Sequence, residues 1–204
     1  MNIIFDIGMV LADFRWHDYA LDRGIPEESI KLLAERMILH PDWNRFDKGA
    51  EPYKEVIEDF AKRFPECPAD FRRFWEDVTD MVYPFDYSEE WLASLRSQGH
   101  KIYLLSNYSE FLFEVHSKKF TFMKHIDGKV ISYEYKTLKP YPEIYHILLD
   151  KYSLDPAECV FIDDRPENAE GAEKCGITGI TFTGYEDACG KLAAVIAEKS
   201  RSVR

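Results

Sequence analysis

The chain alternates short apolar runs with longer segments whose apolar residues recur at helical spacing. Short apolar runs separated by helical segments are typical of a parallel sheet whose two faces are both covered. The first three runs lead into a polar residue, which marks the end of each strand. The pattern predicts strands over four ranges: residues 2–6 (NIIFD), 101–105 (KIYLL), 159–163 (CVFID) and 177–182 (ITGITF).

Helices are expected between and after these strands. The segment 88–99 begins at a candidate N-cap, Ser88, and stops at Gly99, while the segment 141–154 carries Pro142 in its first turn. Two more helical segments, 167–176 and 185–200, complete the chain, and its last residues (KSRSVR) are expected to fray. Strands alternating with helices indicate the α/β class, with a Rossmann-like parallel sheet core and helices on both faces.

Residues 15–85 have a different pattern. They hold charged, aromatic-rich helical segments at 26–40, 51–64 and 68–82, and no strand pattern is visible among them. We expect a small helical bundle inserted after the first strand, with its aromatic side chains in the bundle core. The predicted organisation is therefore a core domain formed by residues 1–14 and 86–204, and a helical cap domain formed by residues 15–85.

Charge and cysteine usage narrow the class of protein. The 204 residues carry a formal net charge of -11, which argues against nucleic acid or an anionic membrane as a partner. The four cysteines form no CxxC pair and have no neighbouring histidine cluster, so a zinc site is not expected. With no signal peptide pattern and no apolar run of membrane-spanning length, we expect reduced thiols and a cytoplasmic location.

Polar residues that could take part in catalysis or ligand binding lie where the predicted strands end. Ligands of open parallel sheets bind beyond the carboxyl ends of the strands, so residues at these ends converge on one edge. Each residue alone has an ordinary explanation as a cap, a turn or a solvated charge, but their occurrence together indicates a functional site. The residues are Asp6, Ser106 and Asn107, Asp163 and Asp164, and Lys139, which precedes a helix.

Three carboxylates at one edge repel one another and need a compensating cation. Oxygen ligands of this kind favour Mg²⁺, which keeps part of its coordination for water and phosphate oxygens. Ser106 and neighbouring backbone N–H groups could hold phosphate oxygens, and Lys139 could neutralise both a phosphate and a nucleophile. The set suits phosphoryl transfer to a carboxylate.

The motifs in this order resemble the haloacid dehalogenase (HAD) superfamily from end to end. FDIGMVL is similar to its first motif, LLSNYS to the second, LKPYPEIY to the third and VFIDDRPENAEGAEKCGITGITF to the fourth. The insertion at 15–85 stands where the superfamily carries a helical cap of the C1 type. The D-x-G-x-V first motif resembles the subgroup of alpha-D-glucose-1-phosphate phosphatases.

The resemblance implies a role for each candidate residue. Asp6 would be the nucleophile, with Lys139 beside it as a catalytic and phosphate-binding residue. Ser106 and Asn107 would bind the phosphate. Mg²⁺ would be held by Asp6, the Gly8 backbone carbonyl and Asp164, with Asp163 as a further ligand or supporting residue. We therefore expect a Mg²⁺-dependent phosphatase of a small phosphorylated metabolite, acting through an aspartyl-phosphate.

Gly8 departs from the pattern of most phosphatases of the superfamily, which carry a second aspartate there as general acid and base. The absence of this aspartate favours esters with good leaving groups, such as sugar 1-phosphates. Hydrolysis of the aspartyl-phosphate, the second step, would then depend on Asp13, a positioned water or the metal. Two alternatives stay open: a weakly active or inactive phosphate-binding protein, and a phosphonatase or dehalogenase-type hydrolase. A receiver domain is disfavoured because the acidic pair comes last in the chain. Neither the substrate nor the oligomeric state is set by the sequence.

Overall fold

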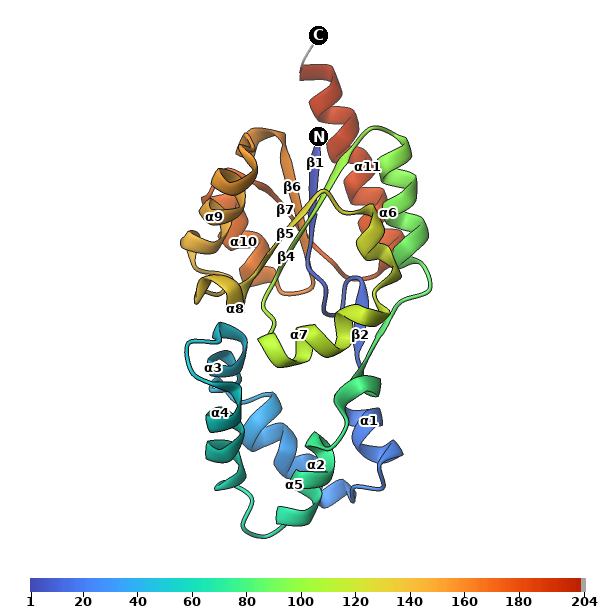
Figure 1. Ribbon diagram of the computed structural model, residues 1–204. Helices are drawn as coiled ribbons and strands as arrows, with labels where there is room; N and C mark the ends of the chain where they lie inside the picture. Colours follow the sequence, from blue (N-terminus) through green and yellow to red (C-terminus); the bar gives the residue numbers. More distant parts are fainter. Residues whose placement is uncertain (203–204) are drawn as a thin grey trace.

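The computed structural model describes residues 1–202, and its core is a five-stranded parallel sheet (Figure 1). The strand order is β5-β4-β1-β6-β7. Phe5 pairs with Leu104 on one side and with Ile162 on the other, so β1, β4 and β6 end side by side. The predicted α/β fold with a Rossmann-like sheet is confirmed. The strands are β1 (Asn2–Phe5), β4 (Lys101–Ser106), β5 (Gly128–Ile131), β6 (Cys159–Asp163) and β7 (Thr178–Thr181).

Helices cover both faces of the sheet because both faces are apolar. Ile3 and Phe5 pack on the side of α6 (Ser88–Ser97) and α11 (Tyr185–Ser202), where Trp91 contacts Phe5 edge to face. Ile4 points to the opposite face, toward α9 (Pro142–Tyr152) and α10 (Pro166–Lys174). This alternation along β1 is the period of a strand buried on both sides.

A helical lobe lies beyond the carboxyl ends of the strands (Figure 1). Two short antiparallel strands, β2 (Ala12–Phe14) and β3 (Val82–Pro84), carry the chain into and out of it. The lobe is formed by the segment for which a helical cap was expected, and the domain boundaries at residues 15 and 85 stay a prediction. Its elements are α1 (Trp16–Asp22), α2 (Glu27–Leu33), a π-helical turn (Ala34–Ile38), α3 (Trp43–Lys48), α4 (Tyr53–Ala61) and α5 (Pro68–Trp75).

Several elements differ from the sequence-based expectation. The helix expected over 68–82 ends at Trp75, and the chain continues through a 3-10 turn (Val78–Met81) into β3. The expectation that residues 15–85 hold no strand was therefore wrong, because β3 is stabilised by pairing with the distant β2. Helix α11 continues to Ser202 where a frayed tail was expected, and residues 203–204 lie outside the described residues.

Short elements of the core domain were also not predicted from the sequence. The edge strand β5 (GKVI) opens with a glycine and a lysine, so it shows no apolar run of its own. The remaining short elements are α7 (Glu110–His116), α8 (Ser132–Tyr135) and 3-10 turns at Ser117–Lys119, Thr121–His125 and Pro156–Glu158.

Candidate active site

Asp6 is the first residue after β1 and lies at the centre of the site. Its backbone N–H donates to the Ile162 carbonyl at 2.9 Å, which continues the sheet by one residue. Its Oδ1 accepts from the Ile7 N–H at 2.7 Å and lies 2.9 Å from the Lys139 Nζ. Burial, with a contribution from the Asp163 carboxylate, raises the pKa of Asp6 to about 7, although Lys139 and Ser106 oppose the increase.

Lys139 is held between two carboxylates. Its Nζ lies 2.6 Å from Asp163 Oδ2 as well as 2.9 Å from Asp6 Oδ1. Burial alone would lower the pKa of Lys139, but Asp163 and Asp6 reverse this and raise it. The ammonium group is therefore charged and fixed beside the candidate nucleophile.

Asp163 is fully buried, and both of its oxygens accept hydrogen bonds. Its Oδ1 accepts from the Arg165 N–H at 2.8 Å and from Asn168 Nδ2 at 3.0 Å, while Oδ2 faces Lys139. A carboxylate engaged in this way orients Lys139 and has little capacity left for a metal ion. The geometry places Asp163 behind the site.

The Asn107 side chain forms two hydrogen bonds with the backbone of Lys139. Its Nδ2 donates to the Lys139 carbonyl at 3.1 Å, and its Oδ1 accepts from the Lys139 N–H at 2.8 Å. Both ends of the amide are used, so the side chain holds the third motif against the second. A phosphate contact from this residue would then come from its backbone N–H.

Three carboxylates of the site lie close enough to share one cation. Oxygen atoms of Asp6, Asp163 and Asp164 lie within 4.8 Å of one another. Asp164 is half-buried and faces the cavity, and burial together with Asp163 raises its pKa. A hard divalent cation relieves the repulsion in such a cluster, and with Asp163 already engaged the carboxylates of Asp6 and Asp164 are the donors that fit Mg²⁺. Gly8 follows Asp6 by two residues and also lines the cavity.

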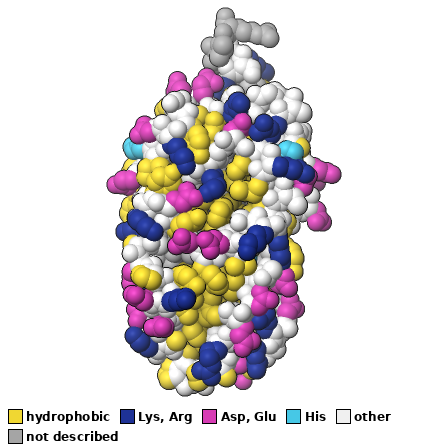
Figure 2. Space-filling view, in the orientation of Figure 1, with side chains coloured by type: hydrophobic (Ala, Val, Ile, Leu, Met, Phe, Trp, Pro, Cys, Tyr) yellow, Lys and Arg dark blue, Asp and Glu magenta, His cyan; other side chains and the backbone are white. Residues whose placement is uncertain are grey.

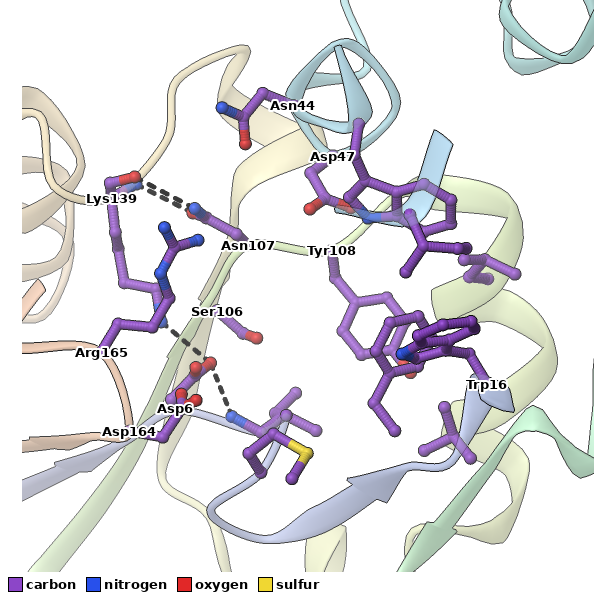
Figure 3. Close-up of a pocket in the computed structure, with 18 of the residues that line it drawn as sticks. Asp6, Trp16, Asn44, Asp47, Ser106, Asn107, Tyr108, Lys139, Asp164 and Arg165 are labelled. Atoms are coloured by element: carbon purple, nitrogen blue, oxygen red, sulfur yellow. Dashed lines mark hydrogen bonds and ion pairs between the residues drawn. The ribbon is translucent and has the colours of Figure 1, made fainter. Parts of the chain in front are cut away.

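A cavity of about 530 Å³ lies between the strand ends and the helical lobe (Figure 3). Polar residues of the core form its floor, and mainly apolar residues of the lobe and its linkers form its walls. Asp13, considered as a candidate acid, lies in β2 opposite Tyr83 and is not among the described residues that line the cavity. The floor contains Asp6, Gly8, Ser106, Asn107, Lys139, Asp164, Arg165 and Asn168, and the lobe and linkers contribute Phe14, Trp16, Ile38, Leu39, His40, Pro41, Trp43, Asn44, Asp47 and Val82.

The lobe contributes residues to the cavity that the sequence reading missed or misplaced. Trp16 and Trp43 line the cavity, although the sequence favoured the bundle core for the aromatic residues of this segment. Phe46, by contrast, is buried in the bundle as expected. Asp47, on the same short helix as Trp43, was not considered because nothing local distinguishes it from a surface acid.

Comparison with known proteins agrees with this arrangement. A family profile described as haloacid dehalogenase-like hydrolase matches residues 3–176. The chain belongs to this family. The superfamily predicted from the four motifs is thus confirmed, and the protein is a hydrolase of that fold.

Two curated relatives and one solved structure illustrate the similarity. The chloroplast flavin mononucleotide hydrolase 1 of Arabidopsis thaliana is 25% identical over 88% of this chain and 71% of its own length. A sesquiterpene phosphatase of Aspergillus oryzae is 27% identical over 95% of both chains. A HAD family enzyme of Bacteroides thetaiotaomicron, solved with magnesium and inorganic phosphate, is 24% identical, with a TM-score of 0.70 over 88% of this chain and 92% of that one. At this identity the solved structure shows the fold.

Proposed function

We propose that this hydrolase is a Mg²⁺-dependent phosphatase of small phosphorylated metabolites that forms an aspartyl-phosphate on Asp6. The observation that carries the proposal is the position of Asp6: its Oδ1 is fixed by Lys139 and the Ile7 N–H at the floor of the cavity. The phosphatase name of the Aspergillus oryzae relative and the magnesium and phosphate in the solved structure support the same reaction.

The candidate residues have separate tasks in this reaction. Asp6 attacks phosphorus, and the Lys139 ammonium neutralises phosphate charge next to it. The Ser106 hydroxyl and the Asn107 backbone N–H hold phosphate oxygens, while Asp163 keeps Lys139 in place.

The metal site would use donors that remain open in this arrangement: the Asp6 carboxylate, the Gly8 carbonyl and the Asp164 carboxylate. When bound, Mg²⁺ supplies positive charge that stabilises the phosphate oxygens during transfer.

The walls of the cavity favour a leaving group with apolar surface. Trp16, Trp43 and Leu39 face this space, and Figure 2 shows hydrophobic side chains gathered along the middle of the helical lobe. A polyhydroxylated sugar needs many hydrogen-bond partners, and unpaired polar groups in a cavity are costly. Sugar 1-phosphates, expected from the first motif, therefore stay a prediction that has to be compared with aryl and prenyl phosphates. The assignment to the glucose-1-phosphate phosphatase subgroup also stays a prediction.

The alternatives receive less support from the site. Phosphonatases of this superfamily use a cap lysine, yet among the described residues Lys139, from the core domain, is the one lysine that lines the cavity. The acidic pair Asp163 and Asp164 argues against the metal-independent dehalogenases. A phosphate-binding protein without turnover would have the same site, so only an assay of turnover distinguishes it from an enzyme.

The test is phosphate release by the purified protein with and without Mg²⁺. The panel contains p-nitrophenyl phosphate, a prenyl monophosphate and glucose 1-phosphate, with the Asp6→Asn variant as the control. We expect Mg²⁺-dependent release that Asp6→Asn abolishes, fastest for the aryl and prenyl esters. Binding of phosphate without turnover of any ester would instead support the binding-protein alternative.

No described helix is long and apolar enough to cross a membrane. We propose the cytoplasmic location expected from the composition, which fractionation of the cells that make the protein would test.

A further inference from the structure

The proposed reaction needs a proton donor that the first motif does not supply. In an in-line displacement, the leaving oxygen lies on the side of phosphorus opposite the nucleophile. The water that later releases phosphate from Asp6 attacks from the same side. One acid and base for both steps must therefore reach the side of phosphorus opposite Asp6, which is the side that faces the helical lobe. Gly8 has no side chain to offer, and no heavy atom lies within 4 Å of the position its Cβ would occupy.

Asp47 occupies that side of the cavity. It lies on α3 of the lobe, and Figure 3 shows its carboxylate pointing into the cavity from the side opposite Asp6. Of the other polar lobe residues that line the cavity, Asn44 has no proton to transfer at neutral pH. His40 is engaged through Nδ1, which accepts from the Asp42 N–H at 3.1 Å.

The position of Asp47 is fixed by contacts between α3 and the core domain. Its backbone carbonyl accepts from the Ser132 hydroxyl at 2.6 Å, and that hydroxyl accepts from the Tyr108 N–H at 2.9 Å. Gly49 ends α3 in a left-handed conformation, and a Cβ there would lie 2.9 Å from the Tyr133 Cβ. Only glycine allows both the turn and this approach. The carboxylate is therefore presented by a rigid contact.

The surroundings of Asp47 suit proton transfer near neutral pH. Burial, followed by the Asp6 carboxylate, raises the pKa of Asp47 to about 7. Lys139, Arg165 and the Ser109 backbone N–H act in the opposite direction. The pKa of Tyr108, which also lines the cavity, is raised by burial and by the carboxylates of Asp47 and Asp6. General acids and bases work best when their pKa lies near the operating pH.

We propose that Asp47 is the general acid and base of the phosphatase reaction, a role that rests on the proposed function. In the first step Asp6 forms a bond to phosphorus, the bond from phosphorus to the leaving oxygen breaks, and Asp47 gives its proton to that oxygen. In the second step water attacks phosphorus and passes a proton to Asp47. The bond to Asp6 breaks, and inorganic phosphate leaves. Asp6 and Asp47 then return to their starting states.

The test compares Asp47→Asn with the wild-type protein on two kinds of ester in the presence of Mg²⁺. An alkyl phosphate has a poor leaving group that needs the proton, so its kcat/KM should fall by ~10²–10⁴-fold. The kcat/KM of p-nitrophenyl phosphate should change little, because nitrophenolate leaves without protonation. Its kcat should fall, since the second step still needs the base. A burst of nitrophenol release and a phosphorylated Asp6 in the variant should accompany this loss.

The matched control is Asp18→Asn, which makes the same chemical change at an exposed lobe acid that does not line the cavity. It should behave as the wild type on both esters. If Asp47→Asn lowers the kcat/KM of both esters equally, or of neither, Asp47 is not the acid and the inference is wrong. A wild-type protein that hydrolyses neither ester would instead refute the proposed function, so the two failures are distinguishable.

Discussion

His116 of α7 donates a hydrogen bond from Nε2 to the Val78 carbonyl at 2.8 Å. A carbonyl can only accept, so Nε2 carries the proton and Nδ1 accepts from the Tyr108 hydroxyl at 2.7 Å. Val78 begins the turn that leads from the helical lobe into β3. Because Tyr108 directly follows Asn107, one neutral histidine links the loop after β4 to the exit from the lobe.

This link predicts a pH dependence of stability. Burial lowers the pKa of His116 from 6.5 to about 4, so the unfolded chain binds the proton first as the pH falls. The stability contributed by the neutral imidazole is complete above pH 6.5 and is lost between pH 6.5 and about 4. The associated change in the free energy of unfolding is roughly 3 kcal/mol. Urea denaturation at pH 7.5 and pH 4.5 measures it.

The matched variant is His116→Gln, whose amide can donate and accept but does not titrate. It should lose less stability than the wild type over this pH range, while other groups that titrate there contribute to both proteins. An equal loss of the free energy of unfolding in the two proteins between pH 7.5 and pH 4.5 would show that the pKa of His116 is not lowered by burial.

Removal of the Asn107 side chain should disturb Lys139 without touching the substrate. Asn107→Ala loses two hydrogen bonds to the Lys139 backbone, each worth roughly 1 kcal/mol. We expect kcat for p-nitrophenyl phosphate to fall by roughly tenfold or more, with the circular dichroism spectrum unchanged. Wild-type kcat in this variant would show that the third motif holds its position unaided.

The two adjacent acids should respond differently to added metal. Asp164→Ala removes an open donor, so higher Mg²⁺ concentrations should restore part of the lost activity. Asp163→Ala removes the carboxylate that fixes Lys139, and magnesium should restore little. Steady-state rates over a Mg²⁺ titration measure both. The same metal dependence in the two variants would place both acids in the metal site.

Leu39 should affect which esters are hydrolysed. It lines the cavity, and the residue is 72% exposed, so Leu39→Ser should cost little stability. We expect KM for a prenyl phosphate to rise by roughly tenfold, with little change for a small aryl phosphate. Leu21→Ser is the control, because Leu21 is also exposed on the lobe but does not line the cavity. Equal effects of the two variants would remove Leu39 from the substrate site.

The sequence predicted those parts of the site that depend on local pattern. Asp6, Ser106 and Asp163 stand at or directly after the ends of apolar strands, and parallel strands bring their carboxyl ends together, so their convergence could be inferred. Asp47 could not be found in this way. Its place in the cavity depends on the contact of α3 with Ser132 and on the pairing of β2 with β3.

The same distinction between local pattern and tertiary contact explains which elements of the fold could be predicted from the sequence. Long amphipathic segments such as α9 were recognisable from their spacing, whereas β5 and β3 are short and polar at one end. Such strands form because a partner strand is already present. Tertiary pairing of this kind leaves no periodic pattern in a single sequence.

The identity of the nucleophile is tested most directly by trapping the intermediate. The protein is mixed with p-nitrophenyl phosphate and Mg²⁺, quenched in acid during turnover, digested and analysed by mass spectrometry. We expect one phosphoryl group on the peptide that contains Asp6, attached to that residue, and none in the Asp6→Asn protein. A phosphoryl group on another residue, or wild-type turnover by Asp6→Asn, would contradict it.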